Sequence, residues 1–316
     1  MRLCVFILIV STPLVSFSQG LKPEVVGHIP RVSHESSGLA KADSDSFWTM
    51  NDGGNRPLLF QINGSGALMS TFAEPNLSNH DWEDLAEDST RLYIGDFGNN
   101  LNKRHNLLIY FRSKAGVKQD SFGRITFHYP DQNQFPPPPS NWNFDCEAFF
   151  HHGDSLYLFS KNLSNPNDGY SKMYRLPDET GDYKAELIDS FYLNEPVTSA
   201  DISPDGKTMV LLTYFSLWVF KGFPGNNFFE GKVFQFPFKG LTPKEAICFA
   251  NDHELFITDE RYVGKGGKLY KIDLNQLDFS QPTKKFKSQF CKRAIYNLVN
   301  NPRAKYRKIM SREAAQ

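Results

Sequence analysis

The fold is decided by residues 82–129, which read Trp-Glu-Asp-Leu-Ala at 82–86, Arg-Leu-Tyr-Ile-Gly-Asp at 91–96, Leu-Leu-Ile-Tyr-Phe at 107–111 and Arg-Ile-Thr-Phe-His-Tyr at 124–129. The four runs are short and rich in aliphatic and aromatic residues, and the gaps between them contain Gly, Asn and Asp. Such runs indicate four consecutive β-strands. No helical period competes with this pattern before the C-terminal tail.

The same four-part layout occurs at five places in the chain. Each copy begins with a short run whose second residue is Ser or Glu, and we call these residues the anchors: Ser37, Glu83, Glu147, Ser199 and Glu245. The anchors are 46, 64, 52 and 46 residues apart, which is close to the length of one four-stranded propeller blade. The sequence therefore predicts an all-β fold, a five-bladed β-propeller over residues 19–280. Six blades would need a further unit, and we find none.

The fifth unit contains only three strand-like runs, the last of them at 268–272. The segment Glu-Val-Val-Gly-His at 24–28 is a candidate for the missing outer strand. Pairing it with 268–272 would close the ring between the two ends of the chain and cover an open sheet edge.

The first 18 residues have the pattern of a secretory signal peptide. Arg2 supplies the positive charge, residues 3–10 are apolar, and Ser16-Phe17-Ser18 offers a small-x-small cleavage site. The apolar run is too short to span a bilayer, and we find no other long apolar stretch. We therefore expect a secreted or periplasmic protein without a membrane span.

The charge is unevenly distributed along the chain. Residues 281–316 contain ten Lys or Arg and a single acid, Glu313, whereas residues 20–280 have 24 basic and 34 acidic side chains. An acidic folded part argues against nucleic acid as a partner.

Within the basic tail, residues 286–299 could form a helix packed on the ring, or the tail could stay solvated. We expect a monomer.

Three cysteines remain after the signal peptide: Cys146, Cys248 and Cys291. Their odd number excludes complete pairing within the chain. Cys146 and Cys248 fall in predicted inner strands, where a buried thiol acts as a small apolar group. We favour that interpretation over a disulfide or a nucleophile.

The five anchors should converge on the propeller axis, because the first strand of each blade lines it. Three of them are carboxylates, which would repel one another and lose hydration. Protonation, pairing with Lys or Arg, or a bound cation would offset this repulsion and loss of hydration. Pairing is not favoured by the sequence, because no basic residue recurs at the positions next to the anchors. A hard divalent ion fits oxygen ligands, and calcium is abundant outside cells. The alternative is that the anchors bond only to water and backbone.

The order Ser37, Glu83, Glu147, Ser199, Glu245 resembles the metal ring of calcium-activated apyrases. These are secreted or lumenal nucleotidases with a five-bladed propeller and a central calcium. The resemblance covers roughly residues 35–275 and implies Ca2+ as the cofactor, with nucleotidase activity. Residues 51–55 read Asn-Asp-Gly-Gly-Asn where the family has Asp-Asp-Arg-Thr-Gly. The chain also resembles uncharacterised exported bacterial propellers in its motifs at 81–86 and 94–100.

A funnel on one face is the candidate place for chemistry, because the second strands should end where the first strands start. Asp52 and Asp96 each follow a second strand, and each has an arginine a few residues later, so they are the candidate catalytic bases. Arginine and lysine clamp anionic oxygens. The candidate substrate-binding residues are Arg56, Arg104, Lys161, Glu260 and Arg261. Alternatively, both aspartates merely tie their turns.

Two functions remain open from the sequence. One is a calcium-dependent hydrolase of phosphoanhydrides or phosphate esters, with a small anionic substrate. The other is a propeller without catalytic activity that binds an extracellular protein or glycan on the same face. Serine-hydrolase order, Walker loop and dinucleotide motif are all absent from the sequence.

Overall fold

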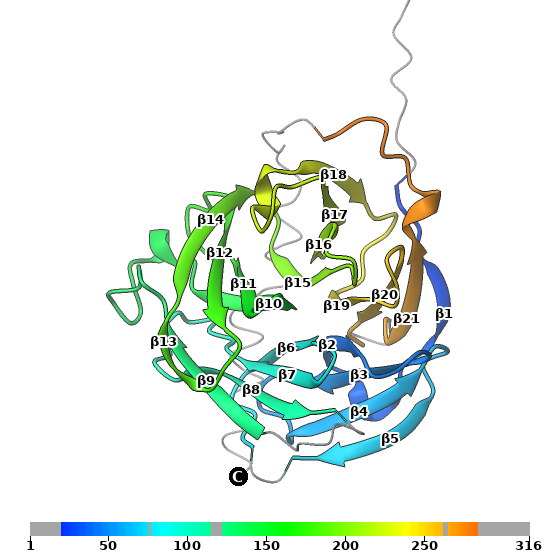
Figure 1. Ribbon diagram of the computed structural model, residues 1–316, viewed down its shortest axis with the longest axis horizontal. Helices are drawn as coiled ribbons and strands as arrows, with labels where there is room; N and C mark the ends of the chain where they lie inside the picture. The colour runs from blue at the N-terminus through cyan, green and yellow to red at the C-terminus, as the bar shows by residue number, and fades with distance from the viewer. Residues whose placement is uncertain (1–19, 75–76, 115–121, 262–264, 284–316) are drawn as a thin grey trace, which may run out of the picture.

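The computed structural model describes residues 20–74, 77–114, 122–261 and 265–283, and these form a ring of five β-sheets around a central axis (Figure 1). The five-bladed propeller predicted from the repeat is thus confirmed. Each sheet is one blade. In blades 1 to 4 the four strands of the blade run from the axis outward in chain order, whereas the outermost strand of blade 5 is the first strand of the chain. The inner and second strands of each blade are antiparallel neighbours.

The strand bounds follow the predicted runs closely. Blade 1 has β2 (Ser36–Lys41), β3 (Ser46–Asn51), β4 (Leu58–Asn63) and β5 (Leu68–Ala73); blade 2 has β6 (Trp82–Glu87), β7 (Arg91–Asp96), β8 (Leu107–Ser113) and β9 (Phe122–His128); blade 3 has β10 (Asp145–His152), β11 (Ser155–Lys161), β12 (Tyr170–Pro177) and β14 (Glu186–Tyr192); blade 4 has β15 (Val197–Ile202), β16 (Thr208–Thr213), β17 (Ser216–Lys221) and β18 (Lys232–Pro237); blade 5 has β19 (Lys244–Phe249), β20 (Glu254–Asp259), β21 (Lys268–Asp273) and β1 (Glu24–His28). Short 3-10 turns lie at η1 (Arg31–Ser33), η2 (Pro139–Asn141), η3 (Phe228–Glu230) and η4 (Leu274–Gln276).

The N-terminal strand closes the ring as predicted. β1 pairs antiparallel with β21, with Glu24 opposite Lys271 and His28 opposite Lys268. A Cβ on Gly27 would lie 1.8 Å from the carbonyl oxygen of Ser65, so only glycine lets β1 pass this close to the β4–β5 turn of blade 1. The first strand, β1, and the last strand, β21, therefore pair in blade 5. β1 also packs closely against blade 1.

Blade 2 has a fifth strand that the sequence did not predict. β13 (Gly181–Lys184) leaves blade 3 and pairs in parallel with β9, the outer strand of blade 2. After a single intervening residue the chain returns to blade 3, whose outer strand β14 begins at Glu186. The β13 segment covers an edge that would otherwise expose unpaired backbone groups.

The hydrophobic core lies between neighbouring blades, because each sheet buries residues on both faces. Between blades 2 and 3, for example, Phe97 meets Phe149 edge-on at 5.1 Å between ring centroids, and both side chains are fully buried. Cys146 and Cys248 are buried free thiols in this core system, as predicted, and burial raises the pKa of both.

Several sequence predictions fall outside the described residues. These are the signal peptide at 1–18, the helix at 286–299 and Cys291. Of the tail, Thr283 is described, and it pairs with β18 through bonds from its N–H to the Val233 carbonyl and from the Gln235 N–H to its hydroxyl. Within the described ranges the chain contains no helix of the length and apolarity that a bilayer crossing needs.

Candidate functional site

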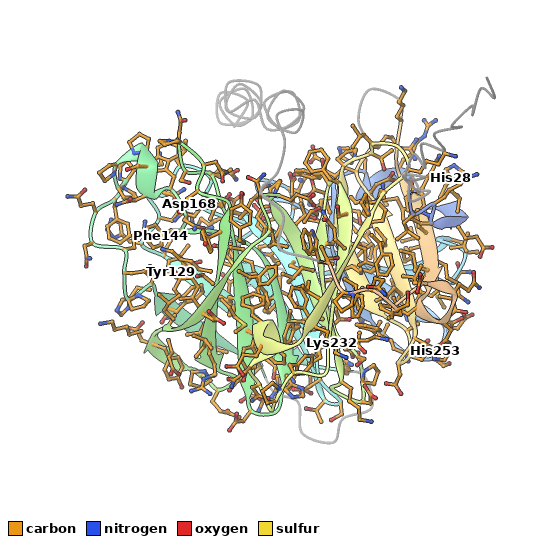
Figure 2. The ribbon with its side chains drawn as sticks, turned by 90° about the horizontal axis from the view of Figure 1, so that it is seen from above. His28, Tyr129, Phe144, Asp168, Lys232 and His253 are labelled. Carbon is orange, nitrogen blue, oxygen red and sulfur yellow. The ribbon has the colours of Figure 1, made fainter. Side chains whose placement is uncertain are left out.

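The inner strands begin, and the second strands end, on the same face of the ring, which we call the top face. The register shows this in every blade, and the pairs are Ser36–Asn51, Trp82–Asp96, Asp145–Lys161, Val197–Thr213 and Lys244–Asp259. In Figure 2, His28 and Asp168 lie toward the top face, and Lys232 and His253 toward the opposite, bottom face. The predicted placement of the second-strand ends is therefore confirmed.

Each inner strand has an irregular register next to this face. The shifts lie between Ser36 and Leu39, Trp82 and Asp84, Cys146 and Ala148, Val197 and Ser199, and Lys244 and Ala246. A bulge leaves one residue out of the ladder and redirects its side chain. The carboxylates of Glu83, Glu147 and Glu245 are placed by these bulges, and all three residues are buried.

In blade 4 the residue at the anchor level is Thr198, not the predicted anchor Ser199. The bulged residue there is Thr198, and Ser199 lies one place deeper, at the level of Asp84 in blade 2. The Ser199 hydroxyl lies 3.1 Å from Asp84 Oδ2 and accepts a bond from the Ile247 N–H at 3.2 Å. Ser199 thus ties blades 2, 4 and 5 together below the anchor carboxylates.

The other two hydroxyls near the bulges bond to the backbone of the next blade. Ser37 donates to the Glu83 carbonyl at 2.6 Å, and Thr198 donates to the Lys244 carbonyl at 2.8 Å. A hydroxyl that donates its proton can still accept a hydrogen bond. Contacts between blades, however, fix where the Ser37 and Thr198 hydroxyls lie.

Lys161 joins the anchors of blades 3 and 5 through a buried chain of contacts. Its Nζ lies 2.8 Å from Glu147 Oε1 and donates to the Tyr214 hydroxyl at 3.3 Å, and that hydroxyl donates to Glu245 Oε1 at 3.0 Å. Burial lowers the pKa of Lys161, but Glu147, Tyr214 and Glu245 outweigh it and hold the pKa well above its ordinary value. Lys161 therefore carries a fixed positive charge inside the protein.

Two further acids stand beside the anchors of blades 2 and 3. A Cβ on Gly98 would lie 2.2 Å from Glu83 Oε1 and 2.6 Å from Asp81 Oδ2, so the backbone after β7 closes directly over both carboxylates. Asp145 is fully buried, and its Oδ1 accepts the Asn99 N–H at 2.5 Å, while its Oδ2 accepts no hydrogen bond from any residue that the structure describes. Burial, then the nearby Glu147, raises the pKa of Asp145 well above its usual range.

One layer deeper, Asp84 crosses the centre of the ring. Its Oδ2 accepts the Phe149 N–H of blade 3 at 3.2 Å, and both carboxyl oxygens contact the Ser199 hydroxyl of blade 4. Burial raises the pKa of Asp84 well above its ordinary value, and the neighbouring Asp201 adds to this. Burial therefore favours the protonated form of Asp84.

Of the two candidate bases, Asp96 is fully buried, and both of its carboxylate oxygens accept hydrogen bonds. Its Oδ1 accepts the Asp81 N–H at 3.1 Å and Nη2 of Arg104 at 2.8 Å, and its Oδ2 accepts the His80 N–H at 3.2 Å. These bonds match the alternative in which the aspartate ties its turn. Beside it, His80 Nδ1 lies 3.3 Å from Oδ2, and the His80 side chain is 51% exposed.

Asp52 is more accessible than Asp96. Its Oδ1 accepts the Asn55 amide at 2.9 Å, and its backbone carbonyl accepts the Asn79 amide at 2.8 Å. The residue is half-buried, and Arg56 nearby in sequence is exposed. Asp52 thus keeps a carboxylate at the edge of the top face.

The remaining predicted binding residues separate into two groups. Lys161 and Arg104 are held in place by the carboxylates described above. Glu260 and Arg261 begin the segment after β20, where the Arg261 N–H bonds to the His34 carbonyl at 2.9 Å. A Cβ on Gly267 would lie 2.7 Å from Nη2 of Arg261, so the guanidinium lies flat against this glycine.

Sequence reasoning missed Asp81, Asp84, Asp145 and Thr198 as members of this site. A signal for two of them exists, because Asp81-Trp82-Glu83 and Asp145-Cys146-Glu147 share the pattern Asp-x-Glu at the start of an inner strand. Asp84 and Thr198 have no comparable signal, since only the register reveals which residues share a level.

Comparisons with known proteins find only remote structural similarity. No protein-family model matches the chain, and no curated protein matches it. Among solved structures, aldose sugar dehydrogenase from Streptomyces coelicolor in its PQQ-bound form has a TM-score of 0.48 at 9% identity, covering 80% of this chain and 97% of that one.

Two further solved structures are similar at the same remote level. A protein of unknown function from Bacteroides thetaiotaomicron has a TM-score of 0.44 at 11% identity, covering 79% of this chain and 74% of that one. Streptogramin B lyase has a TM-score of 0.40 at 12% identity, covering 73% and 78%. These comparisons provide no link to the calcium-activated apyrases.

Proposed function

We propose that the top face binds a divalent cation, calcium, beside the axis, and that this is the functional centre of an exported protein. The observation that carries the proposal is the imbalance of charge there. Glu147, Glu245 and Asp145 act on the Lys161 ammonium, and two more carboxyl groups, those of Glu83 and Asp81, lie beside Gly98 with Asp81 near Asp145. Carboxylates gathered out of water need a cation or a proton.

The donor chemistry fits calcium. All five groups offer hard oxygen atoms, and Asp145 Oδ2 is a buried oxygen that accepts no hydrogen bond within the described part of the chain. The spacing is wider than in a fully protein-coordinated shell, since within the described ranges no three of these acids bring ligand atoms within 4.8 Å of one another. We therefore propose an ion that keeps part of its water, as calcium sites with several water ligands do.

The proposed ligands are carboxylates rather than the full ring of five anchors. Ser37 and Ser199 are positioned by contacts between blades, so they are absent from the proposed set. Lys161 holds Glu147, which directs the cation toward the acids of blade 2 and toward Asp145. The role of Lys161 is thus to place positive charge on one side of the axis and leave the other side to the metal.

Calorimetric titration of chelator-treated protein with calcium tests the proposal. We expect one calcium per chain for the wild type, and at least tenfold weaker binding for Glu83→Gln, because the substitution removes a charge but keeps the shape. Glu186→Gln is the matched control, since Glu186 is 59% exposed on the outer strand β14. Absence of calcium binding by the folded wild type would refute the proposal.

A second function, hydrolysis of phosphoanhydrides or phosphate esters, is favoured by the top-face rim. There the half-exposed His80 and Arg104 both contact Asp96, and the accessible Asp52 lies on the same face, so candidate bases and a guanidinium share one face. A positioned base beside an anion clamp suits phosphoryl chemistry. Release of inorganic phosphate from a panel of nucleotides and phosphate esters tests this, and a silent panel would leave the top face as a binding surface for a protein or glycan.

A further inference from the structure

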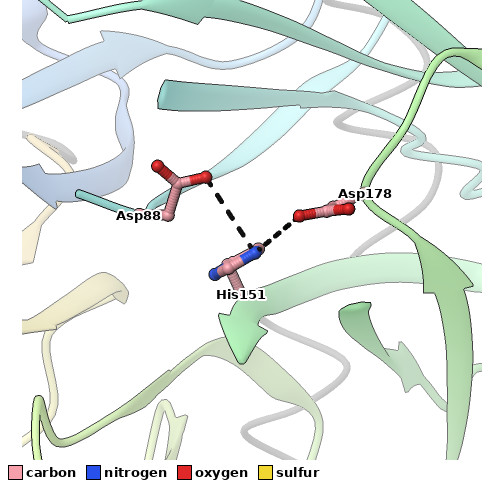
Figure 3. Close-up of side chains that lie close together, drawn as sticks. All are labelled: Asp88, His151 and Asp178. Atoms are coloured by element: carbon pink, nitrogen blue, oxygen red, sulfur yellow. Dashed lines mark hydrogen bonds and ion pairs between the residues drawn. The ribbon is translucent and has the colours of Figure 1, made fainter. Parts of the chain in front are cut away.

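The bottom face contains a second cluster of metal-ligating atoms, independent of the top face. Asp88, His151 and Asp178 bring one ligand atom each to within 4.8 Å of one another (Figure 3). Asp88 follows the inner strand of blade 2, His151 lies near the end of β10 in blade 3, and Asp178 follows β12. The cluster therefore spans the boundary between blades 2 and 3.

The distances around His151 leave one carboxylate beyond hydrogen-bonding reach. Nε2 of His151 lies 3.0 Å from Asp178 Oδ2 but 4.0 Å from Asp88 Oδ2. One nitrogen thus faces two carboxylate oxygens and can give a proton to only one. Ligand atoms of a tetrahedral zinc ion lie about 2.0–2.2 Å from the metal, which separates two of them by about 3.3–3.6 Å. The 3.0 Å and 4.0 Å distances lie on either side of this value, so small side-chain shifts would bring both carboxylates and the imidazole onto one ion.

The cluster is oriented by side chains around it, as metal ligands are. The His151 ring stacks on Tyr93 at 5.4 Å with an interplanar angle of 10°, and the Tyr93 hydroxyl donates to Asp88 Oδ2 at 2.7 Å. The opposite oxygen of Asp88 accepts the Arg91 N–H at 2.7 Å. The imidazole and one carboxylate are thus fixed before any metal arrives.

Accessibility and local charge are compatible with an ion. The three side chains are 12–16% exposed, so solvent can reach the cluster and complete a coordination shell. Two carboxylates and one imidazole also give a net negative charge. The nearby Arg91 guanidinium bonds to the Asp178 carbonyl at 3.1 Å and to Glu179 at 3.2 Å, so the Glu179 carboxylate offsets its positive charge.

From this geometry we propose that Asp88, His151 and Asp178 form a binding site for a borderline transition-metal ion, zinc in the first instance. An imidazole nitrogen with two carboxylate oxygens is a donor set for zinc rather than calcium, because calcium prefers oxygen alone. Water completes the coordination. The ion links the bottom ends of blades 2 and 3, so its role is to staple two neighbouring blades.

Titration of untagged, chelator-treated protein with zinc chloride in a calorimeter tests the site. The wild type should bind one zinc per chain, and His151→Ala should lose at least tenfold in affinity because it removes the only nitrogen ligand. His152→Ala is the matched control, since His152 is the next residue of the same strand but is absent from the cluster. Cobalt chloride provides a second readout, because the site should give visible ligand-field absorption that disappears in His151→Ala.

The outcomes are decisive even if one variant folds poorly. Asp178→Asn keeps the shape of the side chain, and circular dichroism verifies its fold before titration. Wild-type protein that binds no zinc at 100 µM metal, a concentration about 100-fold above a micromolar Kd, would overturn the proposal. So would equal zinc affinity in the wild type, His151→Ala and Asp178→Asn. Calcium should not compete for this site, which separates it from the top face.

Discussion

Replacing Lys161 by Met should reveal how strongly the buried network near the axis depends on its single ammonium. The Lys161 side chain is 0% exposed and that of Glu147 is 3% exposed, and their charged atoms lie 2.8 Å apart. Met keeps most of the volume of Lys but leaves Glu147 without its ammonium. Removing one partner of a buried ion pair costs about 3–5 kcal/mol, because the other charge stays buried.

We expect Lys161→Met to lower the free energy of unfolding by this amount, measured by guanidinium denaturation in the presence of chelator. In a domain of this size each kcal/mol changes the Tm by about 2–4 °C, so thermal unfolding should move down by roughly 6–20 °C. The double variant Lys161→Met/Glu147→Gln should regain part of the loss, since it removes the isolated charge as well.

A control variant separates burial from ion pairing as such. Lys172 pairs with Asp131, but their side chains are 23% and 30% exposed, so Lys172→Met should cost only about 0–1 kcal/mol. Equal effects of the two Lys→Met substitutions, or no recovery in the double variant, would refute the argument. Addition of calcium to Lys161→Met should restore more stability than it adds to the wild type, because the variant has the larger excess of negative charge.

Two further predictions concern the top face and the axis. If the protein hydrolyses phosphate compounds with Asp52 as base, Asp52→Asn should lower the rate of phosphate release roughly a hundredfold or more, and equal rates would eliminate Asp52 from that role. Asp201 accepts the N–H groups of Phe249 and Ile202, and burial raises its pKa to about 7. The folded state therefore binds more protons than the unfolded state between about pH 4 and pH 7, and this carboxyl makes stability fall as the pH rises through that window. Asp201→Asn cannot ionise, so its Tm relative to the wild type should increase from pH 4.5 to 7.5 and then level off; a difference independent of pH would contradict this.

The repeat could be found in the sequence because a blade is a local unit. Each strand of residues 82–129 carries its own pattern of apolar residues and turn signals, so boundaries such as Trp82–Glu87 and Arg91–Asp96 follow from short-range preference. Ring closure by residues 24–28 was also predictable, because an unpaired edge in the last blade demanded a strand. The parallel strand at 181–184 was not, since nothing in those four residues indicates a partner more than 50 positions away.

The sequence by itself determined that three glutamates, Glu83, Glu147 and Glu245, approach the axis from the same face, because equivalent positions in a cyclic repeat must converge. Only the tertiary structure decided what meets them there. Lys161 comes from the far end of a second strand, and Tyr214 links it to another blade, so no local pattern pairs them with the anchors. The one-residue shift of blade 4 arises in the same way, because a bulge changes which side chain faces the axis without changing the strand pattern. The physical reason is that strand formation depends on neighbours in sequence, whereas the charge balance of a buried site depends on neighbours in space.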